Sequence, residues 1–169
     1  MPRPWLPPPA PPAPGVRALS SRSPAPPPGI ASGACAIKLS DSARALLARP
    51  LYAVLATTDG DGAPATSVVW YGLDGDDIVV SSQEGRLKVR NAQRRPAVSL
   101  CVYDPEDPQR YVEVRGTALV SEDEGRALAV RLAERYAGPG AGEDFLKQPP
   151  EDIRVVLRIT PERVTGNAR

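Results

Sequence analysis

The chain contains no histidine, and this absence excludes several kinds of chemistry at once. Histidine-based catalytic triads, metal sites with imidazole ligands and a haem held by a proximal histidine all need that side chain. Cysteine is scarce too. Cys35 and Cys101 lie in very different contexts, which does not indicate a disulfide framework. The aspartate-glycine clusters at 59–62 and 74–77 lack the distal ligands of a calcium loop, so they are interpreted as turns and no metal site is expected.

Long apolar runs are also missing, and acidic residues are absent from the first 40 positions. No segment approaches the roughly 20 apolar residues that cross a bilayer, and the start of the chain has no apolar stretch typical of a secretory signal. Four of the 21 basic residues lie in residues 1–40, so the remainder of the chain is mildly acidic. This balance argues against nucleic-acid binding. We expect a cytoplasmic protein with no membrane or nucleic-acid partner.

Proline divides the chain into two parts. Twelve of the 21 prolines precede residue 30. Proline runs favour extended polyproline II structure, and this segment has little that could form a core. We therefore predict a disordered tail over residues 1–37 and a single folded domain over residues 38–169.

Hydrophobic patterning predicts that the folded domain is mainly β. Alternating apolar and polar residues mark half-buried strands, and glycine- or aspartate-rich turns separate several of them. Short strands of this kind favour an antiparallel sheet that closes into a barrel with a few flanking helices. We expect six strands, at 51–58, 65–74, 77–82, 97–104, 110–120 and 153–166, and helices at 40–49, 84–95 and 121–136, the last opened by a capping box at Ser121 and Glu124.

One short segment concentrates positive charge. The stretch SSQEGRLKVRNAQRR at 81–95 contains five basic residues and one acidic residue. A strand is expected to end there and a helix to begin, and the first N–H groups of a helix attract anions. Arg86 can direct two donors at a phosphate, Lys88 adds a point charge, and Asn91 follows on the same side of the helix. Ser81 and Ser82 can add hydroxyl donors.

A simpler interpretation of the same segment is a solvated helix face. Arg86, Arg90 and Arg94 recur every four residues, as a stripe of exposed side chains does. The residues alone leave both interpretations open.

The order of these segments resembles the pyridoxamine 5′-phosphate oxidase-like split β-barrel superfamily. It resembles more closely the branch of reductases that use the deazaflavin coenzyme F420. Three parts carry the resemblance, which spans residues 39–166: the first hairpin with the turn DGDGAP, the segment GRLKVRN followed by RRP, and YVEVRGTA with the closing strand ITPERVTG. The resemblance implies a six-stranded split β-barrel and a homodimer with cofactor sites at the subunit interface.

The resemblance also implies which residues bind the cofactor. Arg86 and Lys88 match a phosphate-binding pair, and Asn91 matches a residue that supports the same loop. Ser81 and Ser82 match the end of a strand that lines the cofactor. A second strand segment, whose backbone runs along the ring system of the cofactor, is matched by Ser67, Val68 and Val69.

The implied activity is hydride transfer from reduced coenzyme F420 to a small unsaturated or quinone-like acceptor. The cofactor carries this reactivity, so no catalytic protein residue is assigned. Tyr71 could donate a proton and Trp70 could stack near the ring, although a structural place is expected for both. Two alternatives remain: an FMN-binding oxidase or reductase of the same fold, because FMN carries a phosphate as well, and a non-catalytic F420- or flavin-binding protein.

Overall fold

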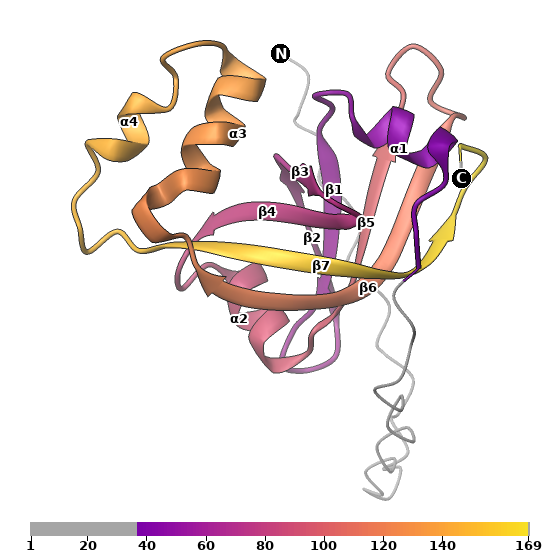
Figure 1. Ribbon diagram of the computed structural model, residues 1–169. Helices are drawn as coiled ribbons and strands as arrows, with labels where there is room; N and C mark the ends of the chain where they lie inside the picture. The colour runs from indigo at the N-terminus through magenta and orange to yellow at the C-terminus, as the bar shows by residue number, and fades with distance from the viewer. Residues whose placement is uncertain (1–36, 169) are drawn as a thin grey trace, which may run out of the picture. The chain divides into compact units, whose positions relative to one another are not determined.

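The computed structural model describes residues 37–168, so the predicted tail at 1–37 lies almost wholly outside the described residues. The described part of the chain forms seven strands and four α-helices (Figure 1). Their bounds are α1 Asp41–Leu47, β1 Ala53–Thr58, β2 Pro64–Val69, β3 Gly72–Asp74, β4 Asp77–Gln83, α2 Leu87–Arg94, β5 Ala97–Tyr103, β6 Tyr111–Glu122, α3 Ala127–Ala137, α4 Glu143–Leu146 and β7 Arg154–Thr165.

All strands belong to one antiparallel sheet, as the sequence predicts. The order of the strands is β2-β1-β5-β6-β7-β4-β3. β6 and β7 are the longest strands and form the middle of the sheet, where they cross the view in Figure 1. α2 lies below this pair in the figure, and α3 and α4 lie on its left.

The strand count differs from the six expected because the predicted strand at 65–74 is broken in two. Its halves, β2 and β3, lie at opposite ends of the strand order. Only Trp70 and Tyr71 separate them, and three Cα–Cα steps span at most about 11 Å. The sheet must therefore roll until its two outer strands approach each other at this corner. β2 and β3 do not pair, so the sheet of the described residues is rolled but stays open.

The concave side of the rolled sheet holds the main core. Inward side chains alternate along most of the long strands; on β6, Val112 and Val114 are buried, whereas Glu113 between them is only partly buried. α1 contributes Leu46 and Leu47 to this core, and α2 contributes Val89. Burial of these side chains is the main force that holds the two helices on the sheet.

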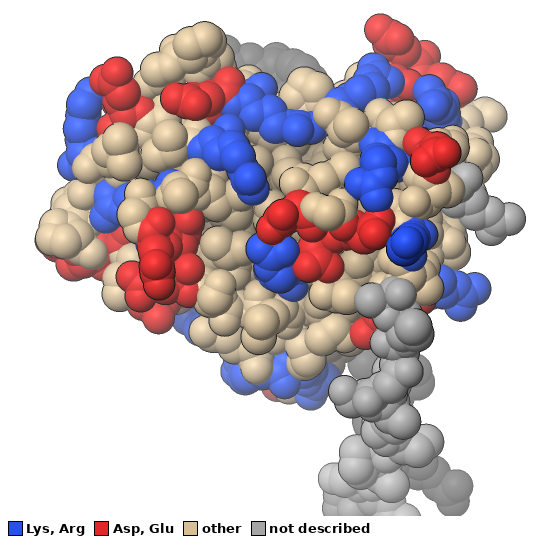
Figure 2. Space-filling model, in the orientation of Figure 1, with Lys and Arg blue, Asp and Glu red and all other residues tan. Residues whose placement is uncertain are grey.

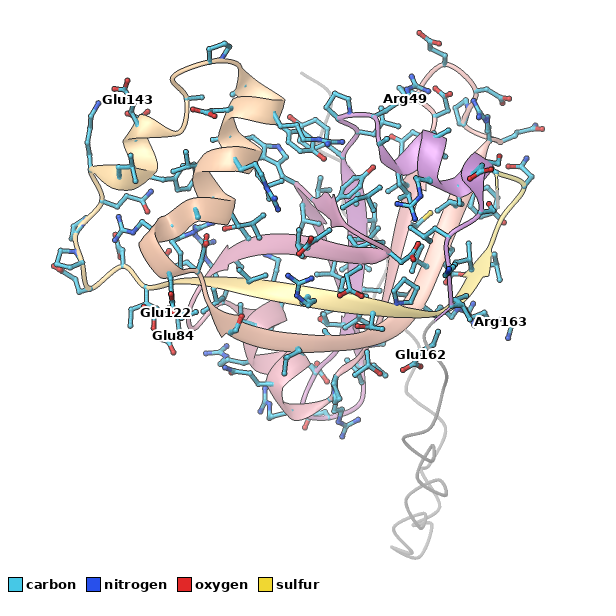
Figure 3. The ribbon with its side chains drawn as sticks, in the orientation of Figure 1. Arg49, Glu84, Glu122, Glu143, Glu162 and Arg163 are labelled. Atoms are coloured by element: carbon cyan, nitrogen blue, oxygen red, sulfur yellow. The ribbon has the colours of Figure 1, made fainter. Side chains whose placement is uncertain are left out.

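A partly buried ion pair ties α1 to the sheet. Arg49, which follows α1 (Figure 3), pairs with Asp104 just after β5. The Arg49 hydrogen bond is the main reason why the pKa of Asp104 lies below its ordinary value. Arg110 approaches the same carboxylate at 3.6 Å.

The predicted start of the third long helix, at Ser121, is wrong. Ser121 and Glu122 continue β6 because they pair with Val156 and Val155 of β7. α3 begins only at Ala127, and the buried carboxylate of Asp123 accepts hydrogen bonds from the backbone N–H groups of its first turn at 2.9 Å. The helix α3 is therefore capped by the side chain of Asp123, which lies outside the helix, and not by Ser121.

A β-bulge interrupts the ladder between β6 and β7. Arg115 pairs with Arg163, whereas the next residue, Gly116, pairs with Pro161, so Glu162 is the extra residue. A bulge is one of the few places in a sheet that accept proline, which has no N–H to donate. Gly116 faces the carbonyl of Thr160 at this point.

In the described part of the chain, no helix combines the length and the apolar character that a membrane crossing requires.

Gly116→Ala should destabilise the protein strongly. A Cβ atom at this position would lie 2.1 Å from the carbonyl oxygen of Thr160, and backbone cannot rotate away as a side chain can. We expect a loss of about 3 kcal/mol or more in the free energy of unfolding, measured by urea denaturation. Gly75→Ala is the control. Its φ of +65° also disfavours alanine, but no atom lies within 4 Å of the new Cβ, so a loss of about 1 kcal/mol is expected. Equal losses in the two variants would contradict the clash.

Glu113→Gln should reduce stability at neutral pH and leave it unchanged in strong acid. The carboxylate of Glu113 accepts hydrogen bonds from Arg115, Ser99 and Thr165, which lower its pKa from 4.5 to about 2. A lowered pKa stabilises the fold above the ordinary value, and this contribution disappears as pH falls toward 2. Because Arg115 is largely exposed, we expect a deficit of only about 1 kcal/mol at pH 7. Thermal unfolding of both proteins should show the gap closing between pH 4.5 and 2; a constant gap would be inconsistent with this network.

Candidate functional site

The turn from β4 into α2 builds the centre of the candidate site. Gly85 takes a φ of +75°, which glycine adopts without strain, and α2 begins two residues later. Arg86 is the residue that precedes the helix rather than part of its first turn, and its side chain makes no capping bond. The first N–H groups of α2 and the positive end of its dipole therefore lie next to the Arg86 side chain.

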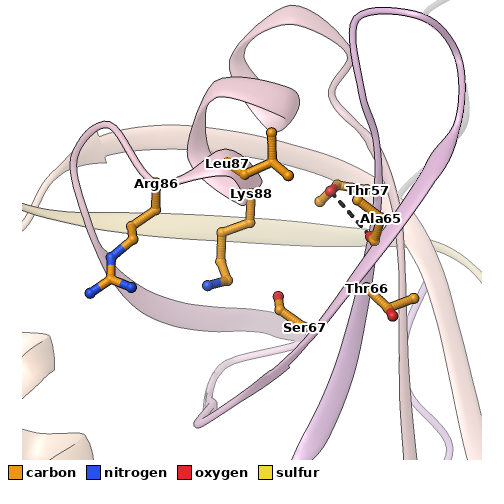
Figure 4. Close-up of a pocket in the computed structure, with 7 residues that line it drawn as sticks. All are labelled: Thr57, Ala65, Thr66, Ser67, Arg86, Leu87 and Lys88. Atoms are coloured by element: carbon orange, nitrogen blue, oxygen red, sulfur yellow. Dashed lines mark hydrogen bonds between the residues drawn. The ribbon is translucent and has the colours of Figure 1, made fainter.

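A hollow of about 200 Å³ lies between this turn and β2. Arg86 and Lys88 point into the space beneath α2 in Figure 4, and Ser67 lies opposite Lys88. Thr57 and Thr66 complete the polar lining, with Ala65 and Leu87 as its apolar members. Hydroxyl groups and two cations thus surround this end of the site, which suits a phosphate.

A second hollow, of about 260 Å³, continues from the first. Both contain Lys88, and both follow β2. The second is lined by Tyr52, Val68, Val69, Trp70, Ser81 and Lys88. We call the two hollows together the β2 groove. One end of the groove is cationic and the other is mainly aromatic and aliphatic, which is the division that a flavin-like ligand with a phosphate side arm requires.

The cations of the groove lack acidic partners. Among the described residues, neither Arg86 nor Lys88 forms a salt bridge, although several other arginines do. Burial lowers the pKa of the half-buried Lys88, and the positive charges of Arg86 and Arg154 lower it further. Neighbouring positive charges without a counterion repel one another and raise the free energy of the unliganded protein. Binding of an anionic ligand would relieve this repulsion.

Asn91 lies behind the groove. It is fully buried, and its side-chain N–H donates to Thr57 Oγ1 at 3.1 Å. Thr57 donates in turn to the carbonyl of Ala65 on β2 (Figure 4). This chain links α2 to β1 and β2 and orients Thr57, which lines the groove. Asn91 therefore does not itself line the groove, but it orients a residue that does.

The structure separates the other predicted site residues. Ser67, Val68, Val69 and Ser81 line the groove. Ser82 is buried and lines neither hollow, because neighbouring residues of a strand point to opposite faces.

The two aromatic residues at the corner also differ from each other. Tyr71 is fully buried, and burial raises its pKa, so it is unsuited to donate a proton in the groove. Trp70 lines the groove and stacks on Tyr136 with ring centroids 5.2 Å apart.

Sequence reasoning missed Thr57, Thr66 and Tyr52. Their segment was predicted correctly as a hairpin, but threonine and tyrosine are ordinary strand residues and carry no local mark of a binding site. Only the roll of the sheet brings them beside α2.

The family model described as pyridoxamine 5′-phosphate oxidase matches residues 39–168. The chain therefore belongs to this family, which confirms the resemblance found in the sequence. No curated protein matches the chain.

Several solved structures are similar. An F420 reductase is 37% identical, covers 72% of this chain and 94% of its own, and has a TM-score of 0.63. A conserved hypothetical protein from Mycobacterium tuberculosis is 26% identical, covers 79% of this chain and 88% of its own, and has a TM-score of 0.62. A heme binding protein from Mycobacterium smegmatis is 26% identical, covers 79% of this chain and 57% of its own, and has a TM-score of 0.55. Family and neighbours together support a flavin- or deazaflavin-related oxidoreductase.

Asn91 and Thr57 should behave as a coupled pair. Asn91→Ala removes a buried hydrogen bond and leaves a small void, so we expect a loss of about 2 kcal/mol in unfolding free energy. Thr57→Val removes the hydroxyl while keeping the shape and should cost about 1 kcal/mol. The double variant should lose about 1 kcal/mol less than the sum, because the two single changes break the same bond. Strict additivity in urea denaturation would show that the contact contributes nothing.

Proposed function

We propose that this protein is an oxidoreductase that binds reduced coenzyme F420 in the β2 groove and passes a hydride to a small unsaturated or quinone-like acceptor. The observation that carries the proposal is the groove itself. In it, Arg86 and Lys88, which form no salt bridge with any described residue, lie beside an aromatic and aliphatic wall along β2. The 37% identity to an F420 reductase favours the deazaflavin over other cofactors. We propose a cytoplasmic location, without a membrane or nucleic-acid partner.

Each part of the groove has a role in this proposal. Arg86 and Lys88 bind the phosphate, with Ser67 as a hydroxyl donor beside them. Val68 and Val69 lie along the ring system, and Trp70 closes the apolar end. The bound cofactor supplies the hydride. The protein binds and orients its ring beside the acceptor and keeps the reacting atoms within reach.

A second copy of the chain would complete the site. The outward side chains of β2, β1 and β5 include Val68, which is 66% exposed, together with Val54 and Tyr103. An exposed apolar surface of this kind is typical of a protein interface. Val68 belongs both to this surface and to the groove, so a homodimer formed here would bring the partner subunit against the cofactor.

FMN is the second candidate cofactor. The family model bears the name of pyridoxamine 5′-phosphate oxidase, and a phosphate site of this kind serves either ligand. A non-catalytic binder of F420 or a flavin is the third possibility, since the heme binding protein from Mycobacterium smegmatis is also similar. Tight cofactor binding without turnover on a panel of unsaturated acceptors and quinones would favour it.

The test is a titration of the full-length protein with coenzyme F420 and with FMN, followed by ligand fluorescence. We expect saturable binding with preference for F420. Lys88→Ala and Arg86→Ala should each weaken binding by about 1–3 kcal/mol, the range for a hydrogen bond to a charged group. Arg90→Ala is the matched control, because Arg90 is an exposed cation of the same helix that does not line the groove.

Preference for FMN would move the protein to the flavin-binding alternative. Absence of saturable binding of either cofactor would overturn the proposal. Equal effects of Arg90→Ala and Lys88→Ala would show that only the net charge matters, and the site assignment would then fail.

A further inference from the structure

Arg154, the first residue of β7, lies directly behind the lining of the β2 groove, although it lines neither of its two hollows. Its Nη2 donates to Ser81 Oγ at 2.8 Å, and Ser81 lines the groove. On its other side Arg154 lines a separate hollow of about 470 Å³, beside α4. The ring of Phe145 lies 5.0 Å from the guanidinium carbon. The guanidinium therefore lines the hollow beside α4 and is joined to the β2 groove by its hydrogen bond to Ser81.

Most of the donors of Arg154 remain free. Arginine has five N–H donors, and the described residues accept one hydrogen bond from this side chain. Its Nε is buried without a partner in the described part of the chain. No carboxylate lies within salt-bridge distance of it among the described residues. A buried donor without an acceptor is costly, so such groups call for a partner.

Two other arginines nearby, Arg158 and Arg126, have acceptors within the protein and serve as a comparison for Arg154. Arg158, four residues further along β7, pairs with Asp74 and Asp77. Arg126 donates to four backbone carbonyls of the segment 145–152. Each of them has several acceptors within the protein, whereas Arg154 donates only to Ser81 among the described residues.

The surroundings of Arg154 are cationic on the groove side. Burial lowers the pKa of Arg154. The negative charge of Asp123 opposes this shift, and the positive charges of Arg86 and Arg126 lower the pKa further. The Asp123 carboxylate already accepts two hydrogen bonds from α3. Glu84 and Glu122 lie at the same end of the sheet (Figure 3) but are exposed and make no salt bridge in the described residues. The lower edge of the molecule in Figure 2, where α2 lies, likewise shows mainly basic side chains.

We propose that Arg154 is a third anion-binding residue of the β2 groove, acting with Arg86 and Lys88 on a ligand that presents at least two negative charges there. This inference rests on the proposed function and adds the charge of the ligand to it. Three unpaired cations exceed what a single negative charge can neutralise. Two charges can come from one phosphomonoester, as in FMN, or from a phosphodiester together with a nearby carboxylate, as in coenzyme F420.

The first experiment compares each cofactor with its phosphate-free counterpart: FMN with riboflavin, and F420 with the dephosphorylated deazaflavin. Arg154→Gln should weaken binding of the phosphorylated ligand about tenfold or more, the effect expected when a charged hydrogen bond is lost. It should change binding of the phosphate-free ligand by less than about twofold. Arg158→Gln is the matched control, with the same change of charge on the same strand. It should leave all four affinities within about twofold of the wild type.

A loss of affinity that is equal for phosphorylated and phosphate-free ligands would show that Arg154 only maintains the shape of the groove, and would overturn the inference. An Arg154→Gln protein that binds like Arg158→Gln would overturn it as well. The ligand whose affinity falls, FMN or F420, identifies the source of the two charges.

The second experiment needs no cofactor. Methyl phosphate, which carries two negative charges at pH 8, should raise the melting temperature of the wild type and of Arg158→Gln. Dimethyl phosphate, which carries one, should raise it less, and Arg154→Gln should abolish the difference. Equal shifts with both esters in the wild type would contradict the requirement for two charges. If neither cofactor binds but methyl phosphate acts through Arg154, the proposed function fails while the anion site stands.

Discussion

The rest of the structure depends on the short connection between the two outer strands of the sheet. Trp70 and Tyr71 alone join β2 to β3, which lie at opposite ends of the strand order. The sheet must roll to satisfy this connection, and rolling creates both the core on the inside and the groove at the corner. Tyr71 is fully buried in the core, whereas Trp70 lines the groove and stacks on Tyr136. Because β4 follows β3 after a tight hairpin, the same corner brings Ser81 to the groove that runs along β2.

Charge pairing then distinguishes the structural cations from the candidate functional ones. Arg49 and Arg158 each meet a carboxylate, and these pairs connect segments that are distant in the sequence. Arg86, Lys88 and Arg154 meet none among the described residues and repel one another. Neighbouring cations without carboxylate partners do not stabilise the fold, and an anionic ligand would relieve their repulsion. The structure divides the basic segment 81–95 between the two interpretations. Arg86 and Arg90 are exposed, as a solvated stripe requires, whereas Lys88 is half-buried and lines the groove together with Arg86.

Local patterns predicted most of the secondary structure, because they depend on neighbours along the chain. The alternation in YVEVRG predicted β6, and a change from strand to helix was expected within the segment 81–95. The errors have long-range causes. The strand expected at 65–74 breaks because its two halves pair with different strands. Ser121 was assigned to a helix, but the pairing of β6 with β7 outweighs its capping potential.

The sequence by itself determined the class of fold, the family, and the segment in which positive charge collects, since composition, periodicity and motif order are properties of the chain. Only the tertiary structure decided which of those residues face one another. Ser81 and Ser82 are equivalent in the sequence, yet the alternation of a strand turns one toward the groove and the other into the core. Arg154 and Arg158 look alike in IRVVLRI, and only the packing of the hairpin β3–β4 against β7 gives carboxylate partners to one and leaves the other unpaired. Pairing of charges across a rolled sheet is a long-range property, and no short stretch of sequence contains it.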